Sequence, residues 1–362
     1  MRATEIHAPT SRSCTFRGNL AKGCLAFLLI SCLLLMTGCT SDNDFDAGWA
    51  AFDQGDYNLA LQKWQPLAEQ GHAMAQNNLG LIYDNGLGVP LDHAEAARWY
   101  KMAAQQDTVQ AQLNLGLLYA DTESEIHDDA EAARWFRKAA ELGNTYAQFG
   151  LGLLHEEGRG VAQDDAKAAH WYRRAAEQGE VDAQYNLGLL YGEGRGVAQD
   201  HAEEAVWHQR AADQGDIQAQ YNLGLLYKHG TGVVQDYGEA ARWFRKAADQ
   251  GEVDAQYALG LLYKDGSGVA KNDAEVARWF RKAAEQGHAA AQYALGLLYL
   301  LGQGVAQDFV TAHMWLSIAA ENGLERSANQ LDEMSPHMAA VEVSEAQRRA
   351  RACINSNHQD CD

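Results

Sequence analysis

A single phrase recurs along this chain at a constant interval of 36 residues. Its clearest copy is AQYNLGLLY, at residues 183–191. The alanine that opens the phrase falls at Ala75, Ala111, Ala147, Ala183, Ala219, Ala255 and Ala291. Because every step is the same, no insertion or deletion disturbs the register. A fixed period of this length is typical of a repeat protein whose units stack on one another.

The pattern within each 36-residue repeat predicts two helices. The apolar residues of the first helix share one face, at Ala183, Leu187, Leu190 and Tyr191. The second helix is expected to bury Ala205, Trp207, Ala211 and Ala212. One helix pair cannot bury its apolar face alone, so neighbouring pairs must stack. The pattern therefore predicts an all-α fold of closely packed antiparallel helix pairs.

Glycines and acidic residues mark the helix ends. Gly188 lies inside the first helix, where glycine costs about 1 kcal/mol against alanine, so its recurrence indicates close approach of a neighbouring helix. Gly194 ends the first helix, and Gly215 is expected to supply a positive φ after the second. Asp200 with Glu203 has the spacing of a capping box. That pairing recurs as Asp92 with Glu95, Asp128 with Glu131, Asp236 with Glu239 and Asn272 with Glu275, and is broken at Lys167 and Thr311.

The full pattern, A-x-x-x-L-G-x-x-Y-x-x-G-x-G-V followed by D-x-x-x-A-x-x-W-x-x-x-A-A-x-x-G, resembles the Sel1-like repeat, a relative of the tetratricopeptide repeat. The resemblance covers seven copies. It implies a right-handed α-solenoid of stacked antiparallel helix pairs, whose concave face binds other proteins. A repeat fold by itself does not fix a biochemical role.

The expected organisation follows from these patterns. Residues 47–72, with the short turn at Gly55, are expected to form a capping helix pair, and Pro336 is expected to open the last helix. The predicted parts are a signal peptide at 1–38, a flexible tether at 39–46, the capping pair at 47–72, seven repeats at 73–324, C-terminal capping helices at 325–354 and a tail at 355–362.

The N-terminal segment predicts a lipid anchor. A basic leader precedes apolar residues 25–30 and 33–36, which are too few for a stable membrane span. The segment ends in Met-Thr-Gly-Cys39, which resembles a bacterial lipobox, and implies acylation of Cys39. An ordinary secretory signal is the alternative. Because Thr40 and not aspartate follows Cys39, the resemblance implies sorting to the outer membrane, facing the periplasm or the cell surface.

Charge and cysteine content narrow the possible partners. The chain has a formal charge of −20, and the leader carries four cations and one anion, so the remainder is near −23. This balance argues against nucleic acid as a partner. Cys353 and Cys361 would remain beside Cys39 after cleavage, and an oxidising compartment favours a disulfide between them. An unbroken helix would hold them about 12 Å apart, so the chain must turn back near Asn355. Alkylation without reductant that labels both thiols would contradict the bridge.

No catalytic or metal-binding motif is present in the sequence. It contains no H-E-x-x-H, Walker, G-x-S-x-G or S-x-x-K pattern, and its histidines are scattered, so neither a catalytic residue, a metal site nor a cofactor is predicted. The second repeat replaces its glycine turn with ADTESEIH at residues 120–127. Drift of an exposed loop and a partner-contacting or ion-contacting loop are both open interpretations.

One aromatic row suggests a binding surface. The first helices carry Tyr185, Tyr221, Tyr257 and Tyr293 at the same repeat position. In the related tetratricopeptide repeat, the tyrosine of Y-N-L-G lines the peptide groove. The row is therefore a candidate partner-binding surface, and packing of the rings between adjacent repeats is the competing interpretation. Alanine at two of these positions is expected to abolish partner capture without changing helicity or melting, whereas loss of folding would favour the packing interpretation.

The sequence thus predicts a binding scaffold or adaptor in the bacterial envelope, not an enzyme. Its expected partner is an envelope or secreted protein or a host protein. The alternatives are a protein that binds or hydrolyses β-lactams, as the resemblance to some Sel1-like proteins implies, and an assembly factor for a polysaccharide or secretion machine.

Overall fold

The computed structural model describes residues 43–356 and Cys361. All regular secondary structure in this part of the chain is helical, which confirms the predicted all-α repeat solenoid. The chain divides into two compact units, Met1–Gln178 and Gly179–Asp362. The handedness of the solenoid stays a prediction.

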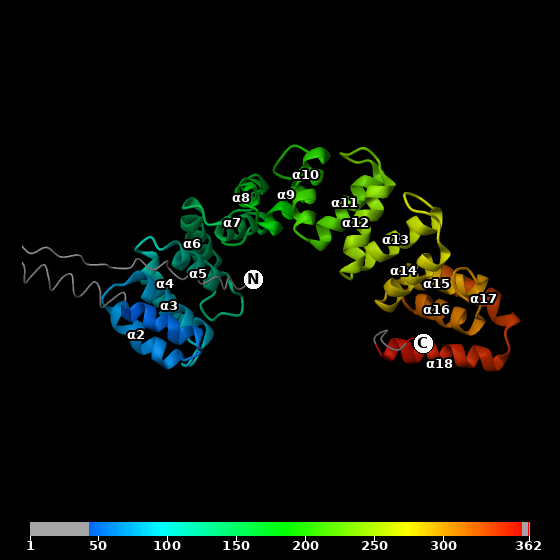
Figure 1. The fold of residues 1–362 in the computed structure, drawn as a ribbon, viewed down its shortest axis with the longest axis horizontal. Coiled ribbons are helices and arrows are strands. Elements are labelled where there is room, and N and C mark those ends of the chain that lie inside the picture. The colour runs from blue at the N-terminus through cyan, green and yellow to red at the C-terminus, as the bar shows by residue number, and fades with distance from the viewer. Residues whose placement is uncertain (1–42, 357–360, 362) are drawn as a thin grey trace, which may run out of the picture. The chain divides into compact units, whose positions relative to one another are not determined.

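The first unit contains an N-terminal helix pair and three repeats (Figure 1). The pair consists of a helix over residues 43–53 and α2 (Tyr57–Glu69). The repeats are formed by α3 (Ala73–Asn85) with α4 (His93–Ala104), α5 (Val109–Ala120) with α6 (Asp129–Glu141), and α7 (Thr145–Glu157) with α8 (Asp165–Glu177).

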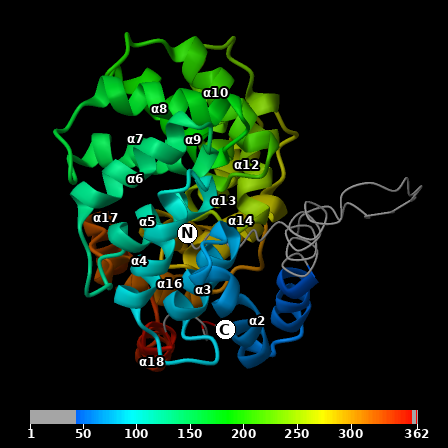
Figure 2. The ribbon, with the colours of Figure 1, turned by 90° about the vertical axis from the view of Figure 1, so that its left-hand side faces the viewer.

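The second unit contains four repeats and the C-terminal helices. The repeats are formed by α9 (Val181–Glu193) with α10 (His201–Asp213), α11 (Ile217–His229) with α12 (Tyr237–Asp249), α13 (Val253–Asp265) with α14 (Asp273–Glu285), and α15 (Ala289–Leu301) with α16 (Phe309–Glu321). After them come α17 (Glu325–Met334), the 3₁₀ turn η1 (Ser335–His337) and α18 (Ala340–Asn355). The two helices of a repeat pack together, as α9 and α10 do in Figure 2, and both α17 and α18 pack on α16.

Close packing explains the glycine inside each first helix. A Cβ atom at Gly224 would lie 2.6 Å from the ring of Phe244, and one at Gly188 would lie 2.8 Å from the ring of His208. No side chain fits at such distances, so the expected close approach of the partner helix is confirmed. The glycine that follows the second helix also has its predicted backbone, since Gly215 has a φ of +100°.

The capping prediction is half right. Asp128 and Asp200 cap their helices, each accepting from the backbone N–H groups two and three residues on. The glutamate does not return the bond, because the N–H of Asp128 already donates to the carbonyl of Tyr119 in the preceding helix. Glu131 instead accepts from Arg134 and from the indole of Trp135. The aspartate therefore caps without a capping box, as it also does where the glutamate is missing.

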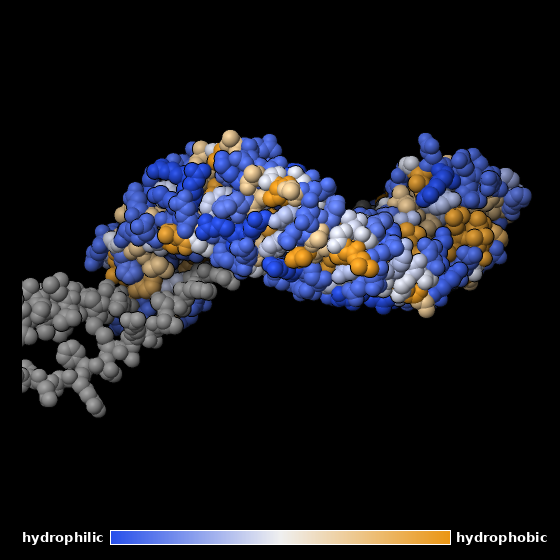
Figure 3. All heavy atoms as spheres, turned by 90° about the horizontal axis from the view of Figure 1, so that it is seen from above, coloured by the Kyte–Doolittle hydropathy of each residue, from blue (hydrophilic) through white to orange (hydrophobic). Residues whose placement is uncertain are grey.

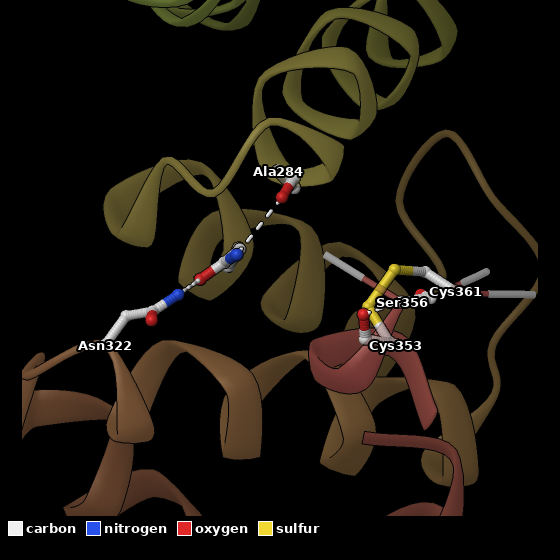
Figure 4. The surroundings of a disulfide bond; sticks show 6 residues. Ala284, Asn322, Cys353, Ser356 and Cys361 are labelled. Atoms are coloured by element: carbon white, nitrogen blue, oxygen red, sulfur yellow. Dashed lines mark hydrogen bonds between the residues drawn. A yellow bond between two sulfur atoms is a disulfide. The ribbon is translucent and has the colours of Figure 1, made fainter. Parts of the chain in front are cut away.

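Within each compact unit, buried glutamines join a repeat to the helix pair before it. Gln220 donates through Nε2 to the carbonyl of Ala212 in the preceding helix, at 3.1 Å, and accepts through Oε1 from Gln250 at 2.8 Å. The same donation recurs from Gln76, Gln112, Gln148, Gln256 and Gln292. Figure 4 shows the last of these junctions, which runs from Asn322 through the glutamine to Ala284. A buried amide that is bonded at both ends fixes the helices on either side of it.

The N-terminal capping pair starts earlier than predicted. Residues 43–46, assigned to the flexible tether, are helical. Phe45 is buried, its carbonyl accepts from the indole of Trp64 at 3.1 Å, and Asp44 pairs with Lys63 at 2.8 Å. Because these contacts hold the upstream turn against α2, the helix continues beyond the predicted boundary at residue 47.

The C-terminal helix starts later than predicted. Pro336 lies in the 3₁₀ turn η1 and not in the first turn of α18, which begins at Ala340. Glu342 explains this start, since its carboxylate accepts from the N–H of Ala339 at 2.8 Å. Cys353, in the last turn of α18, forms a disulfide with Cys361, which follows the helix, and their Cα atoms lie 4.5 Å apart (Figure 4). The chain thus turns back after the helix, as the spacing of the two cysteines requires.

Candidate partner-binding surface

The four tyrosines of the row lie on α9, α11, α13 and α15, all within the second unit. They occupy the same position in each helix, so the repeat presents them in register. Each side chain is half-buried, neither enclosed in the core nor fully in water. Among the described residues, no ring of the row contacts another ring of the row; each has its own neighbours.

The first three rings each pack on an aromatic side chain within their own repeat. The ring centroids lie 5.3 to 5.8 Å from those of an aromatic side chain on the second helix, in tilted geometry. These pairs are Tyr185 with His208, Tyr221 with Phe244, and Tyr257 with Phe280. The packing interpretation and the binding interpretation therefore each describe part of these side chains, since a half-buried ring can do both.

Carboxylates from the following repeats act on the first two tyrosines. Burial raises the pKa of Tyr185, and the carboxylate of Asp216 raises it further. Burial also raises the pKa of Tyr221, with further contributions from Asp254 and Glu252. Asp216 and Glu252 are the N-cap residues of α11 and α13, which places negative charge beside both rings.

The last two tyrosines face cationic or titratable groups instead. The ring of Tyr257 lies 4.5 Å from that of His288, the N-cap residue of α15. The guanidinium of Arg326 lies 4.5 Å from the ring centre of Tyr293, in cation–π geometry. Tyr293 also packs against the buried cluster of Ala312, Leu316 and Met334.

A second set of tyrosines was missed at the sequence level. Tyr263 and Tyr299 lie in the last turns of α13 and α15, and their hydroxyls accept from Arg245 and Arg281 of the preceding repeat. The recurrence of tyrosine at this position in most repeats was visible in the sequence, but the arginine lies 18 residues away on another helix. These hydroxyls are already engaged, so this set joins repeats and is a weaker candidate for ligand binding.

The loop at residues 120–127 is tied to the preceding repeat. Ser124 stands where the other repeats have the second glycine of the turn, and it is buried. Glu125 pairs with His93 at 2.8 Å, and Ile126 packs against an apolar cluster formed by α4 of the preceding repeat together with α5 and α6. No group of three or more histidine, cysteine or acidic side chains within the described residues could hold a metal ion. An ion-binding role for this loop therefore has no support from the geometry.

The predicted lipid anchor cannot be related to the described helices. Cys39 lies outside the described residues. Within the described part of the chain, no helix is both long enough and apolar enough to cross a bilayer.

The face drawn in Figure 3 is mostly hydrophilic, with scattered apolar groups that are most extensive toward the C-terminal end. Scattered apolar residues are normal on protein surfaces, so the tyrosine row, where residue type and repeat register coincide, is the better candidate.

These stacked helix pairs define an α-helical repeat protein. The Sel1 repeat family matches seven consecutive segments, at residues 73–108, 109–144, 145–180, 181–216, 217–252, 253–288 and 289–324. The chain belongs to the Sel1 repeat family.

Solved structures agree with this assignment. A Sel1 repeat protein from Oxalobacter formigenes shares 34% sequence identity with a TM-score of 0.65, over 81% of this chain and 86% of its own. A protective antigen present in uropathogenic Escherichia coli strains shares 29% identity with a TM-score of 0.53, over 89% of this chain and 93% of its own. A comparison with curated proteins gives no match. Sel1 repeat proteins typically mediate protein–protein interactions and are generally not enzymes.

Proposed function

We propose that this protein is an envelope-anchored scaffold that holds a protein partner along the row of Tyr185, Tyr221, Tyr257 and Tyr293. The observation that carries the proposal is the half-burial of all four rings in one repeat register. Each ring is held in part by packing, so it loses little freedom when a ligand covers the part that remains exposed.

The envelope location comes from the sequence. The apolar leader and the lipobox-like segment that ends at Cys39 support export and acylation. Acylation with two or three chains would anchor the protein stably, whereas a single chain would not. The expected partner is accordingly a protein of the envelope, a secreted protein or a host protein.

Alanine substitution tests the row. In the double variant Tyr221→Ala/Tyr257→Ala, partner recovery by crosslinking from envelope fractions is expected to fall at least tenfold. Because each ring is only partly buried, each truncation is expected to cost about 1–2 kcal/mol of stability, and the protein is expected to remain folded. Recovery is measured well below the melting temperature, and circular dichroism verifies helicity.

A matched control separates the row from tyrosines in general. Tyr146 and Tyr237 are exposed and lie outside the row. The double variant Tyr146→Ala/Tyr237→Ala is expected to recover the partner like the wild type. Equal recovery by both double variants would refute binding at the row, and unfolding of the row variant would show that its rings serve packing.

A further inference from the structure

The charge beside the tyrosine row reverses along the second unit. Asp254 and Arg326 occupy the same repeat position, two repeats apart, in the first turns of α13 and α17. Asp254 contributes negative potential at Tyr221, whereas Arg326 covers Tyr293. Position in the repeat is thus constant while the sign of the charge changes.

Carboxylates repel one another at the α9 end of the row. Burial raises the pKa of Asp182, and repulsion by Asp216 raises it further. Burial raises the pKa of Glu180 as well, with a smaller contribution from Asp182. Among the described residues, none of these three carboxylates forms an ion pair with lysine or arginine, whereas carboxylates on the second helices, such as Glu239 and Glu275, pair with the arginine three residues on.

The opposite end of the row is cationic. Arg326 is exposed and forms no ion pair among the described residues. Its helix α17 follows the repeat register, with Ser327 buried at the place of the repeat alanine and donating to the carbonyl of Leu316. Between the two ends, His288 lies between the ring of Tyr257 and Asp254, with Nε2 at 3.4 Å from the Asp254 carboxylate. The sign therefore changes near Tyr257.

We propose, building on partner binding at the tyrosine row, that the row takes an extended polypeptide segment in one orientation only. Lysine or arginine side chains of the segment lie over Tyr185 and Tyr221, among the carboxylates of Asp182, Asp216, Glu252 and Asp254. An acidic side chain or terminal carboxylate of the segment pairs with Arg326 beside Tyr293.

Charge complementarity selects this occupant. A cation over Tyr185 gains from the ring face and also relieves the repulsion among the adjacent carboxylates. The reverse orientation would place anions against that cluster and a cation against Arg326, and such like-charge contacts oppose binding. Four first helices about 10 Å apart span roughly 30 Å, which about nine residues of extended chain can cover.

Two synthetic twelve-residue peptides of identical composition test the orientation. One has three lysines at one end and three glutamates at the other, with a Ser-Val centre, and the second alternates the charges. By fluorescence anisotropy, the block peptide is expected to bind at least tenfold more tightly at low salt, and its affinity should fall as salt rises. A photocrosslinker beside the lysines is expected to label α9 and α11, and one beside the glutamates α15 and α17.

Charge variants locate the contacts. The variants Asp182→Asn/Asp254→Asn and Arg326→Gln are each expected to weaken block-peptide binding about tenfold. The matched controls Asp249→Asn/Asp265→Asn and Arg351→Gln, which change exposed charges elsewhere in the same unit, are expected to bind like the wild type.

Three results would overturn the orientation: equal affinity of the two peptides, crosslinks without end preference, or no block-peptide binding at millimolar concentration. The underlying function is tested separately. If envelope partner capture still depends on Tyr221 and Tyr257 while the peptides fail, the row binds by another chemistry. If capture does not depend on these tyrosines, the proposed function fails.

Discussion

His208 is the one histidine at a core position that the other repeats fill with apolar or aromatic side chains. The equivalent residues are Tyr100, Phe136, Tyr172, Phe244, Phe280 and Leu316. His208 is fully buried under Tyr185, and within the described residues neither of its ring nitrogens has a hydrogen-bond partner. The nearest charged group is Glu204, 3.8 Å from Nε2. Such an unsatisfied buried side chain lowers stability in its own repeat.

Replacing His208 by phenylalanine is expected to stabilise the protein, most of all in acid. Burial lowers the pKa of His208 from 6.5 to about 4. The unfolded chain therefore binds a proton near pH 6.5 that the folded chain refuses until about pH 4, and wild-type stability falls as pH drops through this window. The full loss is about 3 kcal/mol.

The measurement is urea unfolding at pH 7.5, 6 and 4.5. The gap between His208→Phe and wild type is expected to widen as the pH falls. His229→Gln, a change at an exposed histidine, should follow the wild type at every pH. Parallel pH dependence of His208→Phe and wild type would contradict this account.

At the scale of helices, the glutamine junctions hydrogen-bond consecutive repeats to each other, and one of these junctions is incomplete. Gln112 donates to Ala104, but its Oε1 is buried without a partner among the described residues. The donor position, 30 residues on, holds glutamine or asparagine in the other junctions and Leu142 here. Leu142 is 56% exposed, so its side chain contributes little to the core.

The variant Leu142→Gln is expected to complete this junction. Pairing the orphaned oxygen should raise the free energy of unfolding by about 1 kcal/mol, or more if the full desolvation penalty is relieved. Thermal melting followed by circular dichroism measures the gain. Leu142→Met has a similar volume but no donor, and it should melt like the wild type. Equal melting of the two variants would show that the junction stays open.

The sequence was sufficient to predict the features that recur within each helix pair. Gly188, Gly215 and the capping aspartates act within their own helix pair, so period and residue type identified their roles. The glutamine junctions were not predicted, because Gln220 and its partner Gln250 lie 30 residues apart and meet only in the stack. The predicted boundaries of the capping helices were also wrong, because the 36-residue period does not extend to them. Contacts of Phe45 extend the first helix, and Glu342 shifts the start of the last one. For the tyrosine row, the sequence showed the positions of the rings, but not that the charge beside them reverses from one end of the row to the other.

At the scale of the whole molecule, the solenoid is expected to be attached to the membrane through Cys39, which lies outside the described residues. Its strongly negative charge, −20 for the full chain, suits a body that stays off an anionic bilayer surface while acyl chains hold it there.

Cys39→Ala tests the anchor. Wild-type protein is expected to incorporate palmitate in metabolic labelling and to sediment with membranes, whereas Cys39→Ala should do neither. Cys353→Ala, which removes a cysteine of the C-terminal disulfide, serves as the control and should still be labelled. Labelling of Cys39→Ala at the wild-type level would place the modification elsewhere.

The glutamine junctions have a consequence for how such a chain changes length. A junction glutamine such as Gln220 bonds only to the last turn of the preceding repeat and to the end of its own repeat, so a glutamine junction joins only adjacent repeats. If one 36-residue repeat is duplicated or deleted in the gene, the glutamine of each remaining repeat still meets an equivalent residue in the adjacent repeat. A lineage can therefore lengthen or shorten the molecule in whole steps, and adjust how long a ligand it accommodates, without inventing a new contact.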